Sequence, residues 1–319
     1  MKRIGILTSG GDAPGMNAAI RAAVRMGIDR GAEVWGILRG FEGLICGEFQ
    51  PMELSSVSGI IQRGGTVLFT ARSEHFKTEE GLRLAVDQIQ KTGVEGLILI
   101  GGDGTLRGAI ALEERGIPTI GVPGSIDDDL WGTDHTIGFD TAVNTALDAI
   151  DKIRDTATSH ERSFIVEVMG RTAGYIALMA GLAGGAEYIL IPELPYDLAE
   201  LAAANQRAHS RQKRHFIIVL AEGVADAYGL AQEIARRTGV EVKVTVLGYI
   251  QRGGNPSAFD RYMASRLGAS AVEQLLDGQR GQMVGLVQDR VAITEYQEAV
   301  SRRRPIDQDL YRLSRTLGL

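Results

Sequence analysis

Leu97-Ile98-Leu99-Ile100-Gly101-Gly102-Asp103-Gly104 is the stretch of the sequence that most narrows the fold. A short apolar run that ends in glycines is typical of a strand buried in a parallel sheet. A glycine turn directly after such a strand can present backbone N–H groups to a phosphate, and its carboxylate can bind magnesium. The stretch therefore predicts a phosphate-binding turn at the end of a buried strand.

A second stretch, Gly121-Val122-Pro123-Gly124-Ser125-Ile126-Asp127-Asp128-Asp129, follows soon after and supplies three carboxylates. If it is extended, Asp127 and Asp129 point the same way, because strand side chains alternate. Either stretch alone is equally consistent with a tight turn or a solvated acidic loop. Together, each at the end of an apolar strand, they favour magnesium binding and proton removal from an attacking hydroxyl, as in phosphoryl transfer.

Short apolar runs alternate with amphipathic helical patterns through most of the chain, which predicts an α/β fold with mostly parallel sheets covered by helices on both faces. At 319 residues the chain is long enough for two domains. We expect two Rossmann-like three-layer α/β/α domains, with the active site in the cleft between them. The predicted strands are 3–8, 33–38, 96–100, 117–122, 163–168, 187–191, 215–220, 242–247, 282–287 and 290–294. The predicted helices are 15–30, 78–92, 105–115, 139–158, 173–183, 197–210, 228–238 and 258–276.

Composition excludes several classes of protein. The formal net charge of −6, without a basic stripe, argues against nucleic-acid binding. No apolar run approaches 18 residues, so no membrane span is expected. The single cysteine, Cys46, cannot form an internal disulfide, which favours a reducing compartment and a cytoplasmic location. Glycine is abundant, at 41 residues, and lies at the ends of apolar runs, which indicates several loops that contact ligand.

Five ordered motifs carry a family resemblance: Gly10-Gly11-Asp12-Ala13-Pro14-Gly15, Gly-Gly-Asp-Gly-Thr at 101–105, Pro-Gly-Ser-Ile-Asp-Asp-Asp at 123–129, Glu-Val-Met-Gly-Arg at 167–171 and Gln-Arg-Gly-Gly at 251–254. With these motifs the chain resembles the bacterial 6-phosphofructokinase family from residue 1 to about 305. The resemblance implies transfer of the γ-phosphoryl of ATP to the 1-hydroxyl of fructose 6-phosphate, with Mg²⁺, by an allosteric homotetramer. It also implies an ATP-binding domain at 1–138 plus 251–305 and a fructose-6-phosphate-binding domain at 139–250 plus 306–319.

The resemblance assigns roles residue by residue. Asp127 matches the catalytic base, and Arg72 and Arg171 match arginines that neutralise charge on the transferring group. Asp103 matches a magnesium ligand, which Asp129 assists. The expected ATP-binding residues are Gly11, Arg72, Ser73, Gly102, Asp103, Gly104, Thr105 and Gly108. The expected sugar-phosphate residues are Ser125, Asp127, Arg162, Met169, Gly170, Arg171, Glu222, Lys243, Tyr249 and Arg252, with Arg162 lent to the neighbouring subunit.

The resemblance also separates ATP from pyrophosphate as the phosphoryl donor. Pyrophosphate-dependent members carry aspartate in place of Gly104 and lysine in place of Gly124. A side chain at 104 would fill space used by the α-phosphate of the nucleotide, and a lysine at 124 would bind pyrophosphate charge. Both positions are glycine here, which favours ATP.

Two departures fall in the sugar-phosphate site, where Tyr249 replaces a usual histidine and Lys243 a usual arginine. Lysine keeps its charge without the bidentate fork of arginine, and tyrosine carries no positive charge. We therefore expect weaker binding of fructose 6-phosphate than in a typical member, or altered sugar specificity.

An effector site for ADP and phosphoenolpyruvate is implied between subunits. The residues that match it are Arg21, Arg25, Arg154, Gly185, Glu187, Arg211, Lys213 and His215. Leu54 stands where arginine is usual, and Ser55 replaces an aromatic residue that stacks on the effector base. Phosphate-binding charge is kept and base stacking is lost, so inhibition by phosphoenolpyruvate is favoured over strong activation by ADP.

Three other readings compete with this one. Diacylglycerol and NAD kinases also use a Gly-Gly-Asp-Gly turn, but the motifs at 123–127 and 169–171 favour a sugar-phosphate kinase. A kinase of another sugar phosphate remains open because of Tyr249. A catalytically weak, nucleotide-binding regulatory homologue is motivated by Tyr249, Lys243 and Leu54. The presence of Asp127, Asp103, Arg72 and Arg171 argues against it, because a chain released from catalysis has no need of all four.

Overall fold

The computed structural model describes residues 1–318, and the chain in it divides into two compact units. Unit 1 comprises Met1–Thr141 and Arg252–Arg304, and unit 2 comprises Ala142–Gln251 and Pro305–Leu319. The chain thus passes between the units three times. The predicted boundaries after residues 138, 250 and 305 lie close to these passages. The assignment of one ligand to each unit stays a prediction.

Unit 1 is built on a mainly parallel sheet with the strand order β11-β10-β5-β4-β1-β2-β3. The edge strands β3 and β11 run antiparallel to their neighbours. The strands are β1 (Arg3–Thr8), β2 (Glu33–Ile37), β3 (Phe49–Met52), β4 (Gly96–Gly101), β5 (Thr119–Pro123), β10 (Gln282–Val287) and β11 (Arg290–Glu295). Every residue of β4 and β5 is buried, as expected for central strands covered on both faces.

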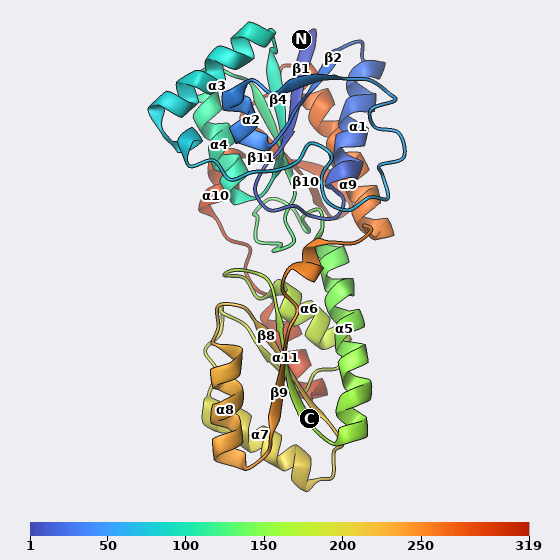
Figure 1. Ribbon diagram of the computed structural model, residues 1–319, viewed down its shortest axis with the longest axis vertical. Helices are drawn as coiled ribbons and strands as arrows, with labels where there is room; N and C mark the ends of the chain where they lie inside the picture. Colours follow the sequence, from blue (N-terminus) through green and yellow to red (C-terminus); the bar gives the residue numbers. More distant parts are fainter. Residues whose placement is uncertain (319) are drawn as a thin grey trace. The chain divides into compact units, whose positions relative to one another are not determined.

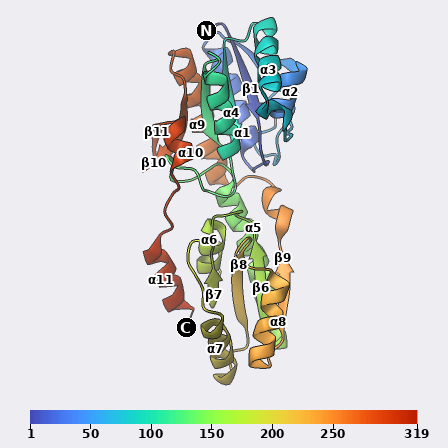
Figure 2. The same cartoon turned by 90° about the vertical axis from the view of Figure 1, so that its left-hand side faces the viewer.

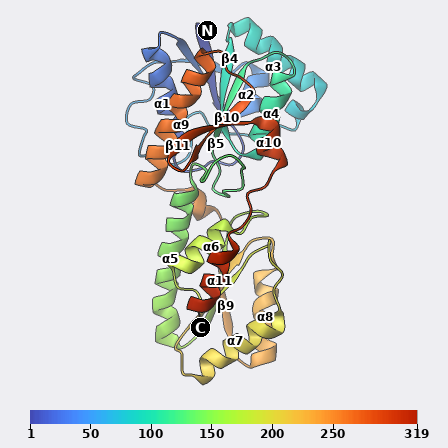
Figure 3. The same ribbon diagram turned by 180° about the vertical axis from the view of Figure 1, so that it is seen from behind.

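Helices cover both faces of this sheet (Figures 1 and 3). One face carries α1 (Met16–Asp29) and α9 (Ala258–Leu276), which pack on each other. The other face carries α2 (Gly40–Cys46), α3 (Glu79–Thr92), α4 (Asp103–Glu113) and α10 (Tyr296–Ser301), with the short 3-10 helix η1 (His75–Lys77) beside α2 and α3. The core between these layers joins side chains of β4 to those of α3 and α4.

Unit 2 has a smaller, wholly parallel sheet with the strand order β7-β8-β6-β9. Its strands are β6 (Ser163–Val168), β7 (Tyr188–Leu190), β8 (Phe216–Ala221) and β9 (Val242–Val246). Helices α7 (Leu198–Ser210) and α8 (Ala227–Thr238) cover one face, and α5 (Phe139–His160) and α6 (Tyr175–Ala183) lie on the other (Figure 1). The 3-10 helix η2 (Gly248–Arg252) follows β9.

The C-terminal helix α11 (Gln308–Leu317) packs on α6 and β7 of the same unit (Figure 2). The Arg315 guanidinium lies 4.0 Å from the centre of the Tyr188 ring and pairs with Glu200. The hydroxyl of Tyr311 donates to the carbonyl of Ile189 at 3.4 Å. The tail after Arg304 is therefore an integral part of unit 2.

The α/β class, the predicted strands and the longer helices are confirmed. The predictions omitted α2, β3, α10 and α11. Each is short, and β3 includes Pro51, which strand patterns disfavour except at an edge. None of the helices described in residues 1–318 is long and apolar enough to span a membrane.

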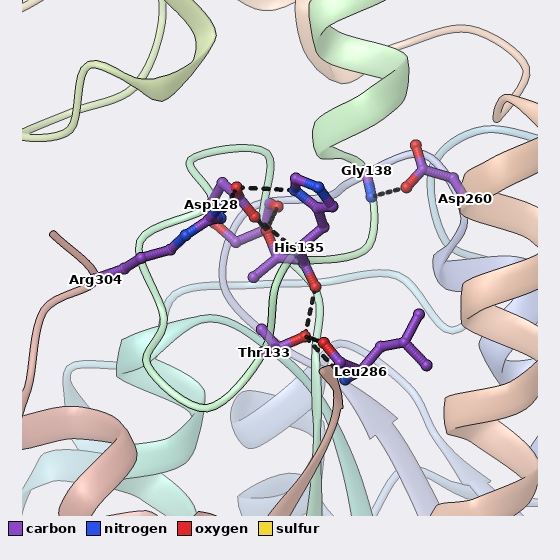
Figure 4. Close-up of polar contacts among 9 residues, drawn as sticks. Asp128, Thr133, His135, Gly138, Asp260, Leu286 and Arg304 are labelled. Atoms are coloured by element: carbon purple, nitrogen blue, oxygen red, sulfur yellow. Dashed lines mark hydrogen bonds and ion pairs between the residues drawn. The ribbon is translucent and has the colours of Figure 1, made fainter. Parts of the chain in front are cut away.

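Asp260, near the start of α9, is a fully buried carboxylate that holds the start of α5. It accepts a hydrogen bond from the backbone N–H of Gly138 at 2.8 Å (Figure 4). It also accepts from the N–H of Thr141 at 2.8 Å and from the Thr141 hydroxyl at 2.5 Å. These N–H groups belong to the residue before α5 and to its first turn, where helices lack internal acceptors. Burial outweighs these bonds and raises the pKa of Asp260 to about 6.

This raised pKa predicts a pH-dependent contribution to stability. Between pH 4 and 6, roughly, folded Asp260 keeps a proton that the unfolded chain releases, so its contribution to the free energy of unfolding falls as pH rises, by about 3 kcal/mol in all. Asp260→Asn has no such titration. We therefore expect the stability of the wild type relative to this variant to fall from pH 4.5 to pH 7, measured by urea unfolding. A difference that stays constant with pH would contradict the assignment.

Candidate functional site

Three loops of unit 1 meet at one edge of its sheet because the strands before them are adjacent and parallel. Strand β4 pairs with β1 on one side and with β5 on the other. The N–H of Ser9 donates to the carbonyl of Ile100 at 3.0 Å, and that of Gly124 to the carbonyl of Gly101 at 2.9 Å. The chain leaves β1 and β4 toward opposite sides of the sheet, so this edge includes the switch point where α/β proteins bind ligands.

The glycine turn at 101–104 leads directly into α4. Gly102 is the residue before the helix, and Asp103 is the first helical residue. A helix start with free N–H groups and a positive dipole end is a favourable position for a phosphate. The Asp103 carboxylate is partly exposed and pairs with Arg107 one turn later at 2.9 Å. This hydrogen bond raises the pKa of Arg107.

The glycines of this region differ in the structural reason for having no side chain. A side chain at Gly108 would meet the Phe41 ring at 2.3 Å, so packing alone explains this glycine. A side chain at Gly11 would approach the guanidinium of Arg252 at 3.0 Å. At Gly104 no atom of residues 1–318 outside the adjacent residues and the nearby backbone of α4 lies within 4 Å of the point that a Cβ would occupy, and its φ is not in the left-handed region. Neither backbone conformation nor packing therefore requires glycine at 104.

Two predicted nucleotide contacts use their hydroxyls inside the fold. The buried Thr105 hydroxyl donates to the carbonyl of Ser9 at 3.1 Å, and so ties the first two loops together. The Ser73 hydroxyl accepts from the N–H of Phe76 at 3.1 Å at the start of η1. Arg72, beside it, is exposed. Contacts of these three residues with a nucleotide stay predictions.

The acidic loop does not have the extended form that would point Asp127 and Asp129 the same way. Asp128 has a φ of 56°, in the left-handed region, so the alternation of side chains is broken there. The condition of that prediction is therefore not met. The Asp128 carboxylate makes bonds across the loop, to the N–H of Thr136 at 2.7 Å and to His135 at 3.2 Å (Figure 4). Such bonds outweigh an extended preference and cannot be read from local sequence.

Asp127 and Asp129, on either side of this turn, differ in their exposure to solvent. Asp127 is buried, and Asp129 is partly exposed. The N–H of Asp127 donates to the Ser125 hydroxyl oxygen at 3.2 Å. Within residues 1–318 no group of three or more His, Cys, Asp or Glu side chains could hold a metal ion. Magnesium commonly needs only one or two protein carboxylates beside phosphate oxygens and water. Magnesium binding by Asp103 and Asp129 stays a prediction.

In unit 2 the predicted sugar-binding residues fall into two groups at opposite edges of the sheet. Met169, Gly170 and Arg171 follow β6, and Glu222 follows β8, at the carboxyl edge. Glu222 accepts from the N–H of Gly170 at 3.1 Å and of Arg171 at 2.7 Å, so it shapes this loop. Burial, with the charges of Glu222 and Asp226, raises the pKa of Glu167 beside it.

Arg162 and Lys243 lie at the amino edge, because Arg162 precedes β6 and Lys243 pairs with Phe164. The length of β6, about 17 Å at roughly 3.3 Å per residue, separates them from Met169. Both face Glu241, whose carboxylate lies 2.6 Å from Lys243 Nζ and 3.8 Å from Arg162 Nε. The hydrogen bond from Lys243 lowers the pKa of Glu241. One sugar phosphate therefore cannot reach both edges of the same unit.

The remaining two sugar-site predictions lie in or beside η2. Arg252 belongs to unit 1, with its guanidinium packed over Gly11. Tyr249 belongs to unit 2 and is 77% exposed, and its contact with a sugar phosphate stays a prediction. Between them, fully buried Gln251 accepts from the N–H of Met169 at 2.9 Å through its side-chain oxygen, a contact that the motif alone does not predict.

Five of the predicted effector residues form one cluster at the amino edge of unit 2. Buried Glu187 pairs with Lys213 at 3.0 Å and lies 3.5 Å from His215. Arg154 lies 2.9 Å from His215 and packs at Gly185. Burial lowers the pKa of His215, with Arg154 and Lys213 opposing the attraction of Glu187. Arg21 and Arg25 lie on α1 of unit 1, and Arg211 ends α7.

The comparisons with known proteins agree in the family that they indicate. Residues 3–275 match the phosphofructokinase family. The chain is 57% identical over the full length of both chains to the ATP-dependent 6-phosphofructokinase of Halalkalibacterium halodurans, and 58% identical over the full length to ATP-dependent 6-phosphofructokinase 1 of Thermus thermophilus. The structure of phosphofructokinase from Saccharomyces cerevisiae matches with a TM-score of 0.88 and 37% identity over 94% of this chain and 45% of that chain.

Proposed function

The chain belongs to the phosphofructokinase family, and on that premise we propose that it transfers the γ-phosphoryl of ATP to the 1-hydroxyl of fructose 6-phosphate, giving fructose 1,6-bisphosphate and ADP. Full-length identity to ATP-dependent 6-phosphofructokinases supports this reaction over that of a regulatory homologue. The observation that best supports ATP as the phosphoryl donor is the open space beside Gly104, at the start of α4. Neither the backbone conformation nor the packing of the fold requires a glycine at this position.

In this proposal the residues of unit 1 hold the nucleotide and the proton acceptor. The N-terminal end of α4 and the glycine loops bind phosphate oxygens through backbone N–H groups. Asp103 and Asp129 hold Mg²⁺, which when bound neutralises charge on the phosphates. Asp127 accepts the proton of the attacking 1-hydroxyl. Ser125 orients Asp127 by accepting from its N–H, and its own proton stays available to a ligand oxygen.

Residues of unit 2, together with Arg252 of unit 1, supply further sugar contacts, and Arg171 of unit 2 supplies a cation. Glu222 fixes the Gly170–Arg171 backbone, and the Arg171 guanidinium neutralises charge on the transferring group. Met169, Tyr249 and Arg252 contact the sugar phosphate. Arg72, from unit 1, joins Arg171 in neutralising the charge that develops on the transferring group.

We further propose that the protein works as a homotetramer, because the predicted sugar-site residues of one chain do not lie together. We also propose that it is cytoplasmic. Arg162 and Lys243 share Glu241 at the amino edge of unit 2, a strand length from Met169. We infer that both cations bind the phosphate of a sugar held by a neighbouring subunit. The Glu187 cluster, with Arg21 and Arg25, is proposed as the effector site for phosphoenolpyruvate or ADP.

The first experiment measures ADP release from Mg-ATP with and without fructose 6-phosphate. We expect sugar-dependent turnover in the wild type and a loss of at least about a hundredfold in kcat for Asp127→Asn, which cannot accept the proton. Omission of Mg²⁺ should abolish turnover, and pyrophosphate should not replace ATP. Nucleotide binding without turnover at saturating fructose 6-phosphate would favour another acceptor or the regulatory reading.

Gly104→Ala tests ATP binding and stability with opposite expected signs. Alanine is the better helix former and meets no atom, so we expect the free energy of unfolding to rise by about 0.5–1 kcal/mol. The methyl group should weaken ATP binding by about 1–3 kcal/mol if it enters the phosphate space. Gly108→Ala, in the same helix, is the control and should be destabilised by Phe41. Urea unfolding and the KM for ATP measure both effects; unchanged ATP affinity would contradict the proposal.

Tyr249→His and Lys243→Arg restore the usual family residues at the sugar-phosphate site. We expect each to lower the KM for fructose 6-phosphate, and both together to improve binding by about 1–3 kcal/mol, because charged hydrogen bonds to the phosphate are gained. Tyr228→His, at another exposed tyrosine of unit 2, is the matched control and should leave the KM unchanged. An unchanged KM in the double variant would count against these assignments.

A further inference from the structure

Asp128 lies between the two working carboxylates of the acidic loop, but its own carboxylate is occupied by the protein. Its side chain is 2% exposed. It accepts from the N–H of Thr136 at 2.7 Å, with the Thr136 hydroxyl at 3.3 Å, and it has His135 Nδ1 at 3.2 Å. Arg304 forms an ion pair with the same carboxylate (Figure 4). A side chain so enclosed is not available to a substrate.

These bonds hold a backbone conformation that an aspartate does not favour. The φ of 56° at Asp128 is in the left-handed region, which L-residues other than glycine adopt much less often than the right-handed one. The reversal there sets where the chain directs Asp127 before it and Asp129 after it. The hydrogen bonds and the ion pair of the Asp128 carboxylate therefore stabilise this left-handed backbone conformation.

The partner side of the loop is itself fixed to the core of unit 1. Ser125 N–H donates to the carbonyl of Ile137 at 3.1 Å, and the Thr136 hydroxyl donates to the carbonyl of Ser125 at 2.5 Å. Leu286 N–H donates to the Thr133 hydroxyl at 3.1 Å (Figure 4). The His135 ring stacks on Phe139, with the two ring centres 5.4 Å apart. Asp128 thus connects the part of the loop that carries Asp127 and Asp129 to the segment 133–136, which is hydrogen-bonded to the rest of unit 1.

Arg304 also neutralises the negative charge of the buried Asp128 carboxylate. Three consecutive carboxylates repel one another, and a buried carboxylate without a cation is strongly destabilising. The guanidinium of Arg304 compensates Asp128, so the middle carboxylate adds little negative charge against Asp127 and Asp129. Without Arg304 the turn would have to rearrange to hydrate Asp128.

We propose that Asp128, Arg304 and His135 form a positioning network that aims Asp127 and Asp129 in the phosphoryl-transfer reaction. This inference rests on the proposed function and deepens it, because it assigns residues that act through the working carboxylates. Asp128 and Arg304 are positioning residues and touch neither substrate. Their loss should lower the rate of the chemical step more than the binding of either substrate.

The test compares Arg304→Gln and Asp128→Asn with Arg83→Gln. Arg83 is the control, because it is an exposed arginine of unit 1 that pairs with Asp87 within α3 and not with the acidic loop. Arg304→Lys keeps the charge and serves as the rescue variant. For each protein we would measure kcat, the KM values for ATP and fructose 6-phosphate, the Tm, and amide hydrogen exchange in the segment 124–137.

We expect Arg304→Gln and Asp128→Asn to lower kcat about tenfold or more, with both KM values within about twofold, and to speed exchange in 124–137 about tenfold. Arg83→Gln should change neither kcat nor this exchange, and Arg304→Lys should recover most of kcat. Exchange in 124–137 equal to that of Arg83→Gln would overturn the proposal, as would a fall in kcat without faster exchange. If Asp128→Asn does not fold, Arg304→Gln decides.

The same data keep this proposal apart from the proposed function. A wild type without sugar-dependent ADP release would refute the kinase reaction, whereas exchange in 124–137 would still report whether Arg304 holds the loop. Normal wild-type turnover with unchanged exchange and kcat in Arg304→Gln would refute only the positioning network.

Discussion

The side-by-side parallel pairing of β1, β4 and β5 is the constraint on which the candidate site depends. The carboxyl ends of neighbouring parallel strands lie at the same edge of a sheet, so the pairing of the strands alone brings together three loops that are far apart in sequence. Two backbone bonds, from Ser9 to Ile100 and from Gly124 to Gly101, then lock these loops in register. The burial of the central strands supplies the free energy that holds loops rich in glycine and carboxylates, which are costly to order.

Sequence predicted most of the fold because its signals are local. The apolar runs at β4 and β8 and the periodic helices α3 and α8 are visible in a short window, and they appear as expected. Short elements such as α2 and β3 were missed, since their few residues carry no periodic pattern. Residues at strand ends, such as Asp103 and Glu222, could be placed at a sheet edge from the sequence. Their hydrogen-bond partners could not.

The part of the site that sequence could not give depends on contacts between distant residues. The left-handed turn at Asp128 exists because of partners eight and 176 positions along the chain, Thr136 and Arg304. The separation of Lys243 from Met169 follows from strand register, which fixes opposite ends of β6. A family motif names such residues together but does not say which lie in one chain's site. Tertiary geometry is needed for both conclusions.

Gly104 has a consequence for how the choice of phosphoryl donor can change over generations. Because the fold leaves its surroundings empty, a mutation there meets no packing penalty, so selection acts on this position through ligand binding and not through folding. Gly124 is different, since a side chain would press on Met16 at 3.1 Å and Ile100 at 3.3 Å. An evolutionary path toward another donor is therefore easier to begin at 104, with the change at 124 waiting on an accommodating neighbour such as the flexible Met16.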